Sequence, residues 1–194
     1  MRGSSDNDVL NAIKKRRSVR VYKPDKIPGD ILGTIIEAGN QAPSGMNSQP
    51  WRFVVVEDMV LHNKLLETAV PNAKKLMEPL KESNPERYQL IMQRYDDLED
   101  PVYYSAPAII FVIGVGTYAD LSCPLACQNI MLAAHSLGIG SCWVQFGSFV
   151  TGNEEIVKAF ELKEGEKIFG PVILGYPESV TEPPEKKPPV IKWL

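Results

Sequence analysis

Residues 107–115 are Pro-Ala-Ile-Ile-Phe-Val-Ile-Gly-Val, and this stretch decides the fold class. Its run of β-branched and other apolar residues shows no alternation with polar positions, which is typical of a strand buried on both faces. A second apolar stretch, residues 125–137, has hydrophobic side chains on nearly every side of a helix, which predicts a buried central helix. The two segments together predict a central sheet flanked by helices.

Shorter patterns surround these two segments. The sequence predicts helices at 7–16 (capped by Asp6 or Asp8), from Pro28 to a stop at Gly39, at 61–69 and at 154–160, and strands at 51–56, 141–145 and 168–174. Pro171 is expected to place the last strand at an edge of the sheet, or to lie at the strand's beginning. Because two helices come first and the strands follow at uneven intervals, the order favours an α+β fold with a mixed or antiparallel sheet.

Residues 70–100 form a polar stretch with three prolines. We expect helical pieces that pack poorly on one another, and a mobile or lid segment. The tail from Tyr176 contains five prolines within 177–189 and is expected to be extended.

Length and composition limit the number of domains and the classes of function that the chain can have. A chain of 194 residues with 44% hydrophobic residues suits one globular domain over 1–194, in which residues 1–6 are expected to be disordered or tag-like. A net charge of −3 argues against nucleic-acid binding. The apolar run is too short for a bilayer, the polar N-terminus lacks a signal sequence, and three cysteines suit a reducing cytoplasm.

Four polar side chains, Arg16, Arg17, Ser18 and Arg20, follow the first predicted helix. The guanidinium group suits bidentate recognition of phosphate, so this cluster is a candidate phosphate site. The alternative is a basic helix end that complements the helix dipole.

The loop from Pro43 to Trp51 is the second candidate. Ser44, Asn47, Ser48 and Gln49 offer uncharged donors and acceptors, and Gly45 permits a close backbone approach. Such groups can read the edge of a heteroaromatic ring, although the same composition also suits a simple turn.

The third candidate is the segment 138–147, in which a helix turns into a short strand. Its glycine pair lacks the spacing of a dinucleotide fingerprint. Two interpretations remain: the segment presents a backbone amide to a ligand, or it is a tight turn. The three cysteines lack the spacing of a metal site, because Cys142 lies well beyond the pair Cys123 and Cys127, and they are interpreted as buried small hydrophobic residues. No paired base suggests a cysteine nucleophile, and no Gly-x-Ser-x-Gly elbow suggests a serine hydrolase.

Taken in order, four motifs resemble the nitroreductase family of FMN-dependent oxidoreductases. They are Arg-Arg-Ser-Val-Arg at 16–20, Ala-Pro-Ser-Gly-Met-Asn-Ser-Gln-Pro-Trp at 42–51, Gly-Ile-Gly-Ser-Cys-Trp at 138–143 and Gly-Pro-Val-Ile-Leu-Gly-Tyr-Pro at 170–177. The resemblance covers about residues 7–189. It implies a nitroreductase-like α+β fold and an intertwined homodimer with two FMN molecules at the interface. The central helix would be buried between the subunits, and residues 176–194 would form an extended arm onto the partner.

The same resemblance assigns roles to single residues. Arg16, Ser18 and Arg20 would bind the phosphate and ribityl chain, with Arg17 acting through its backbone or on the isoalloxazine edge. Pro43, Ser44, Gly45 and Asn47 would come from the partner chain and line the ring. The backbone at Gln145, Phe146 and Gly147 would approach flavin N5. Lys187 would reach the phosphate, although proline stands where many relatives have an arginine, which shifts phosphate binding toward Arg16 and Arg20.

The resemblance further implies an enzyme that takes hydride from NADH or NADPH and reduces a nitroaromatic or quinone in two half-reactions at one flavin face. No side-chain acid, base or nucleophile is needed, because catalysis depends on positioning. Tyr88, Tyr95, Tyr103 and Tyr104 either shape the acceptor pocket or simply pack. The alternatives are a flavin carrier or sensor, a reductive dehalogenase of iodotyrosine type, and flavin fragmentation on the same fold.

Overall fold

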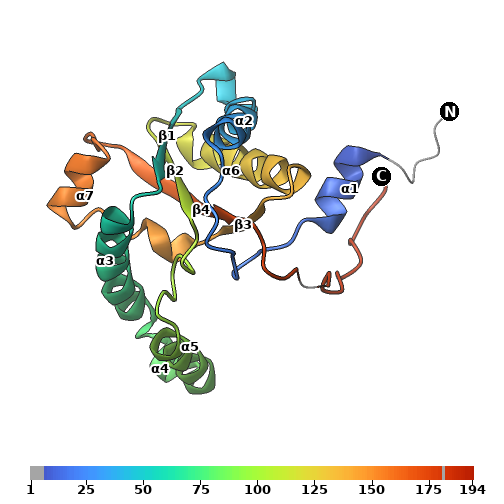
Figure 1. The fold of residues 1–194 in the computed structure, drawn as a ribbon. Helices are drawn as coiled ribbons and strands as arrows, with labels where there is room; N and C mark the ends of the chain where they lie inside the picture. Colours follow the sequence, from blue (N-terminus) through green and yellow to red (C-terminus); the bar gives the residue numbers. More distant parts are fainter. Residues whose placement is uncertain (1–6, 181) are drawn as a thin grey trace.

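Four antiparallel strands form the sheet at the centre of the fold (Figure 1). The computed structural model describes residues 7–180 and 182–194, so the expectation for residues 1–6 lies outside the described residues. The strands are β1 (Trp51–Val56), β2 (Ala108–Gly114), β3 (Gly140–Trp143) and β4 (Lys167–Gly175). Their spatial order is β1-β2-β4-β3, and each neighbouring pair is antiparallel. The predicted α+β class is confirmed.

Strand β2 is buried along its whole length, as its sequence predicts. Ile109, Phe111 and Ile113 pack into the core on one face of the sheet. Ala108, Ile110 and Val112 pack into the core on the other. This alternation follows from the period of two along a strand, and it gives the fold two hydrophobic cores that share one sheet.

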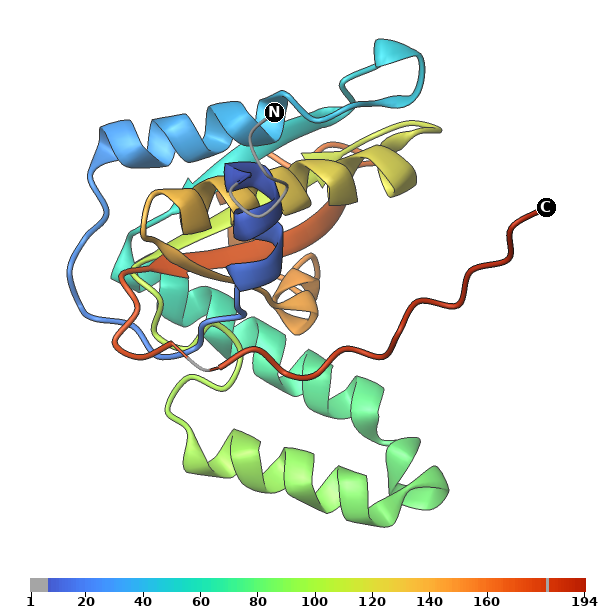
Figure 2. The same ribbon diagram turned by 90° about the vertical axis from the view of Figure 1, so that its right-hand side faces the viewer.

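Helices cover both faces of the sheet (Figures 1 and 2). Helices α2 (Gly29–Asn40) and α6 (Ala119–Ser136) contribute to one core, and α3 (Met59–Met77) and α7 (Glu154–Ala159) contribute to the other. Helix α1 (Asp8–Lys15) stands beside the sheet, and α4 (Leu80–Ser83) and α5 (Pro85–Asp97) project from the body. In the described part of the chain, every helix is too short or too polar to cross a membrane.

Strand β4 lies inside the sheet, so the expectation of an edge strand from Pro171 is wrong. The register between β2 and β4 shifts opposite Phe111, where Gly170 and Pro171 together face one residue. Proline is tolerated at such a bulge because no ladder hydrogen bond is required of its nitrogen. The extra residue also lets Phe169 and Val172 face the same core.

Two helix boundaries differ from expectation. Helix α1 is capped by Asn7, whose Oδ1 accepts from Leu10 N at 3.1 Å, and not by Asp8, while Asp6 lies outside the described residues. Helix α2 has Pro28 as its N-cap and continues past Gly39 to Asn40. Gly39 faces Ile130 of α6, where a Cβ would approach to 2.7 Å. This glycine therefore serves close helix packing and does not end the helix.

Residues 70–100 are better packed than expected. Helix α3 continues through Pro71 to Met77, and Ala73, Met77 and Tyr95 are buried in the core beside it. The expectation of poor packing is wrong for this inner side, whereas residues 81–87 are exposed.

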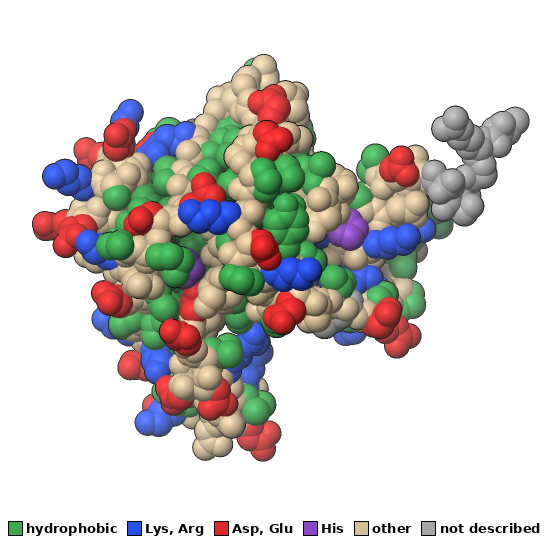
Figure 3. Space-filling view, viewed as in Figure 1, with side chains coloured by type: hydrophobic (Ala, Val, Ile, Leu, Met, Phe, Trp, Pro, Cys, Tyr) green, Lys and Arg blue, Asp and Glu red, His purple; other side chains and the backbone are tan. Residues whose placement is uncertain are grey.

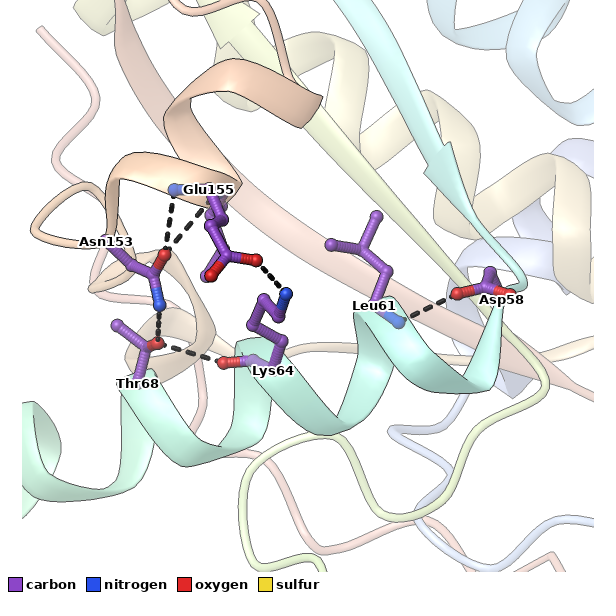
Figure 4. A network of polar contacts seen from close by, with 7 residues as sticks. Asp58, Leu61, Lys64, Thr68, Asn153 and Glu155 are labelled. Atoms are coloured by element: carbon purple, nitrogen blue, oxygen red, sulfur yellow. Dashed lines mark hydrogen bonds and ion pairs between the residues drawn. The ribbon is translucent and has the colours of Figure 1, made fainter.

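Polar contacts tie α7 to α3 (Figure 4). Asn153 caps α7 with its Oδ1 and donates from Nδ2 to Thr68 Oγ1 at 3.0 Å. Lys64 of α3 forms an ion pair with Glu155. At the start of α3, Asp58 Oδ1 accepts from Leu61 N at 2.8 Å. The contacts of Asn153 and Glu155 fix the position of the short helix α7 against α3, whereas Asp58 caps α3 itself.

Asp100 organises the turn that leads into β2. Its carboxylate is buried and lies 2.8 Å from His62 Nε2. It also accepts from the backbone N–H groups of Val102, Tyr103 and Ser105 at 3.1, 2.7 and 2.8 Å. Burial raises its pKa, but the hydrogen bonds from His62 and the backbone outweigh burial and hold the pKa below its ordinary value.

We expect Asp100→Asn to lower the free energy of unfolding at pH 7 by about 3 kcal/mol, because it removes the charge that these donors share. A folded-state pKa below the unfolded value means that the contribution is complete above about pH 4 and is lost as the pH falls. The stability gap between the two proteins should therefore narrow from about pH 5 to about pH 3 in urea unfolding curves.

Asp97→Asn, at an exposed carboxylate of α5, is the matched control and should leave stability unchanged at pH 7. Equal stability of Asp100→Asn and the native protein, or a gap that does not vary with pH, would contradict this role for Asp100.

Candidate functional site

The basic segment after α1 runs along the edge of β3. Val19 N donates to Ser141 O at 3.0 Å, and Ser18 and Ser141 form a parallel bridge. Val19 is buried against this strand, whereas Ser18 and Arg20 on either side are exposed. The alternation fixes the backbone of the cluster to the sheet and turns its polar side chains outward.

A cavity of about 550 Å³ lies beside this segment. It is lined by Ile13, Lys14, Arg16, Arg17, Ser18, Arg20, Pro184 and Lys186. Every charged lining residue is positive, so the cavity favours an anion. The predicted Lys187 is exposed and does not line it, whereas its neighbour Lys186 does.

Several polar atoms of this region are buried without a partner in the described residues. They are Arg16 Nη1, Arg17 Nε and Ser141 Oγ. Arg17 Nη1, in contrast, donates to Lys14 O at 2.8 Å and to Arg16 O at 2.6 Å. Buried guanidinium and hydroxyl groups need acceptors, and the oxygens of a phosphate would satisfy them. The donor set therefore fits a phosphorylated ligand.

His135 stands next to the same arginines. It lines a smaller cavity of about 160 Å³ together with Arg16, Arg17 and Ser141. Burial lowers the pKa of His135, and the charges of Arg16, Arg17 and Lys15 lower it further. A neutral imidazole adds no charge to the cluster at neutral pH.

The second candidate, the loop 43–50, contains a short 3₁₀ helix, η1 (Gly45–Asn47). Gly45 N donates to Ser122 Oγ of α6 at 3.3 Å, and Ser44 Oγ accepts from Gln49 N at 3.0 Å. Met46 and Asn47 are exposed yet have φ angles of 54° and 53°. Such φ angles cost energy in residues other than glycine, least of all in asparagine, and the loop's hydrogen bonds hold them in place.

The structure does not bring this loop and the basic cluster together within one chain. The loop contacts Ser122 in the first turn of α6, whereas Arg16 and Arg17 lie beside His135 in its last turn. Thirteen residues of helix separate these ends by about 20 Å. Figure 2 shows the loop at the far end of α6 from the segment that follows α1.

The third candidate directly follows β3 as the 3₁₀ helix η2 (Gln145–Ser148). Gln145 and Phe146 open this helix, so their N–H groups have no partner within it. Side chains fix the turn, since Trp143 Nε1 donates to Gln145 Oε1 at 3.0 Å and Tyr103 OH donates to Gly147 O at 2.9 Å. Strand β3 thus joins the basic cluster at its start to η2 at its end.

One set of contacts was not expected from the motifs, although Arg20 belongs to the basic cluster and Tyr104 is among the tyrosines expected to shape the acceptor pocket or to pack. The guanidinium carbon of Arg20 lies 5.8 Å from the centroid of the Tyr104 ring, and that of Arg94 lies 5.2 Å from it. Arg94 comes from α5 and is more than seventy residues from Arg20 in sequence, so no local pattern could predict that both arginines meet at one ring.

The structure confirms the interpretation of the three cysteines as small buried residues. Cys123, Cys127 and Cys142 are free and buried. Burial, with smaller charge effects, raises the pKa values of Cys123 to about 11 and of Cys127 to about 12, and burial raises that of Cys142 as well. Thiols in this state are poor nucleophiles.

Comparisons with known proteins agree on the family of this chain. A model of the Nitroreductase family matches residues 13–176. A nitroreductase with bound FMN from Bacteroides fragilis is 31% identical, with a TM-score of 0.78 over 97% of this chain and 100% of that one.

Two curated relatives differ in their named activity. A Methanothermobacter thermautotrophicus protein, provisionally named NADH dehydrogenase/NAD(P)H nitroreductase, is 30% identical over 89% of this chain and 79% of its own length. The iodotyrosine deiodinase of Thermotoga neapolitana is 32% identical over 69% of this chain and 71% of its own length.

The contact between Gly45 and Tyr118 yields a test of the loop. A Cβ on Gly45 would lie 2.4 Å from Cδ1 of Tyr118, so Gly45→Ala forces the ring or the loop to move. We expect a loss of about 2 kcal/mol, or about 6 °C in Tm. In a Tyr118→Ala background the same change should cost less than about 0.5 kcal/mol.

Gly33→Ala is the control, because Gly33 has open space around it in α2 and should not lower Tm. Equal losses from Gly45→Ala in both backgrounds would contradict the proposed contact.

Proposed function

Because the chain belongs to the nitroreductase family, we propose that it is an FMN-dependent oxidoreductase. It would take hydride from NADH or NADPH and reduce an electron-poor acceptor such as a nitroaromatic or a quinone. The observation that carries the proposal is the set of buried, unpartnered donors Arg16 Nη1, Arg17 Nε and Ser141 Oγ beside a cationic cavity. These donors match the phosphate end of FMN.

Three segments of the chain would hold the cofactor. Arg16, Ser18 and Arg20 would bind the phosphate and ribityl chain, with Lys186 or Lys187 closing the cavity. The backbone at the start of η2 would donate toward the ring, in a turn that Tyr103 and Trp143 keep rigid. When bound, FMN supplies a ring that accepts and returns a hydride, while the protein supplies binding and orientation.

We infer a homodimer from the separation of the site's two halves. The loop around Ser44, Gly45 and Asn47 lies about 20 Å from the basic cluster along α6, so a partner chain would supply it to each site. Leu121 of α6 is 74% exposed and Ile13 of α1 is 53% exposed, which supports an apolar contact surface. Figure 3 shows hydrophobic side chains gathered over α2 and α6.

The C-terminal tail supports the same assembly. It leaves the body as an extended arm (Figure 2), and its last residues expose large apolar side chains at Val190, Ile191, Trp193 and Leu194. An arm without a core of its own gains stability by lying on a partner.

The proposed chemistry balances without a side-chain acid or base. NADH or NADPH loses a hydride, and a quinone gains that hydride together with one proton from solvent. The products are the oxidised nicotinamide and a hydroquinone. The chain's own contribution is to position donor and acceptor in turn over the ring and to exclude water. We propose the cytoplasm as its location, because reduced nicotinamides are produced there.

The visible absorbance spectrum tests the cofactor. We expect an oxidised-flavin spectrum that is bleached by NADPH or NADH without oxygen. Arg16→Gln should weaken FMN binding about 10- to 100-fold, because it removes a charged donor from the phosphate. Lys26→Gln, at an exposed lysine outside the cluster, is the control. No flavin binding even with added FMN, or unchanged affinity in Arg16→Gln, would refute the proposal.

Molar mass measured together with bound flavin tests the shared site. We expect Leu121→Asp to convert the dimer to a monomer and to release FMN, because a buried charge would disrupt the contact surface. Leu90→Asp changes a leucine of similar exposure, 69%, on α5 and should leave both properties unchanged. A monomeric Leu121→Asp variant that keeps its flavin would contradict sharing between chains.

A reductive dehalogenase is the second candidate, because the Thermotoga neapolitana deiodinase is 32% identical to this chain. It predicts release of iodide and tyrosine from 3-iodo-L-tyrosine by the dithionite-reduced protein. A flavin carrier or sensor instead predicts a bound flavin that neither nicotinamide reduces.

A further inference from the structure

Tyr104 lies at the meeting point of two arginines from distant parts of the chain. The Arg20 guanidinium is 5.8 Å and the Arg94 guanidinium 5.2 Å from its ring centroid. The turn that carries Tyr104 is held by the buried Asp100 through hydrogen bonds on both sides. Tyr104 and Ser105 have φ angles of 57° and 51°, a conformation that costs energy in residues other than glycine. The ring is therefore a fixed platform.

The two arginines lack a carboxylate partner within the described residues. None of the ion pairs there includes Arg20 or Arg94, and the nearby Asp96 of α5 pairs with Lys74 at 3.0 Å. Both side chains are exposed, so water screens their mutual repulsion, and each keeps a cation–π contact with the ring. Two positive charges in one place favour the approach of an anion.

A third donor lies in the same place. Tyr95 is only 9% exposed, and its hydroxyl has no partner in the described residues. Burial, helped by Tyr104 and opposed by the charge of Arg94, raises the pKa of Tyr95 to about 12. The hydroxyl thus stays protonated and remains available as a donor.

The cavity beside Arg16 and Ser18 accounts for Arg20 but not for the other three residues. Arg20 lines that cavity, but Arg94, Tyr95 and Tyr104 do not. Arg20 therefore stands at the border of two regions, with the phosphate donors on one side and the α5 residues on the other. The turn that carries Tyr104 also adjoins η2, because Tyr103, next to Tyr104, donates to Gly147 O at 2.9 Å.

We propose that Arg94 and Tyr95, beside the Tyr104 ring, bind the anionic group of a carboxylate-bearing electron acceptor, with Arg20 shared between that group and the cofactor. The proposal rests on the proposed function and names its substrate class. Helix α5 projects beyond the sheet (Figure 2), so a substrate can reach its arginine from solvent. A carboxylate would accept from both guanidinium groups and from the phenol.

Paired ligands of equal shape test the proposal. In the flavin-loaded protein, 4-nitrobenzoate and its neutral counterpart 4-nitrobenzamide are compared as acceptors. Calorimetry measures the binding of benzoate and benzamide to the same protein, without turnover. We expect the native protein to favour the carboxylates about tenfold, and Arg94→Gln to abolish that preference. Tyr95→Phe should reduce the preference and leave the fold intact.

Arg87→Gln, at an exposed arginine of the same helix, is the control and should keep the preference. No preference for benzoate in the native protein overturns the proposal, whether or not FMN is bound. Weakened FMN binding in Arg94→Gln with an unchanged benzoate preference also overturns it and assigns Arg94 to the cofactor. A failure of FMN binding in the native protein, by contrast, refutes the proposed function.

Discussion

Helix α6 separates the loop around Gly45 from the basic cluster at Arg16, and the functional account depends on that separation. The helix spans about 20 Å between these two ends, is buried on its inner side, and contacts one candidate segment at each end. A single ligand that needs both segments must therefore bind between two chains. The exposed apolar surface of α6 and the extended C-terminal arm give a dimer the means to form.

Local charge, rather than net charge, governs the candidate site. The chain carries a net charge of −3, yet every charged side chain that lines the cavity beside β3 is positive. The fold concentrates them by pairing the segment after α1 with β3 and by bringing the tail alongside. Arg94 extends the positive region to α5, where Tyr95 adds a neutral donor. A phosphate and a carboxylate would then occupy neighbouring regions with Arg20 between them.

The parts of this arrangement that depend on residues adjacent in the sequence could be predicted from it. The unbroken apolar run predicts β2, and the polar loop and basic cluster are visible as short motifs. Pro171 misled the prediction, because a bulge opposite Phe111 removes the need for its missing N–H group. The predicted helix end at Gly39 was wrong as well, because this position requires glycine for close packing against Ile130 and not for ending the helix. The contacts of Asp100 with His62 and of Arg20 with Tyr104 join distant segments and leave no local pattern.

Counting cofactor sites in a mixed dimer tests the central claim most directly. One chain would carry Arg16→Glu and the other Asn47→Asp, each with its own affinity tag, and dimers that hold both tags would be titrated with FMN. If each site takes its basic cluster from one chain and its loop from the other, one site receives both defects and the other receives none. The account predicts one tight FMN site per mixed dimer and none in either variant homodimer. No tight site in the mixed dimer would mean that both halves come from the same chain, which would contradict the account.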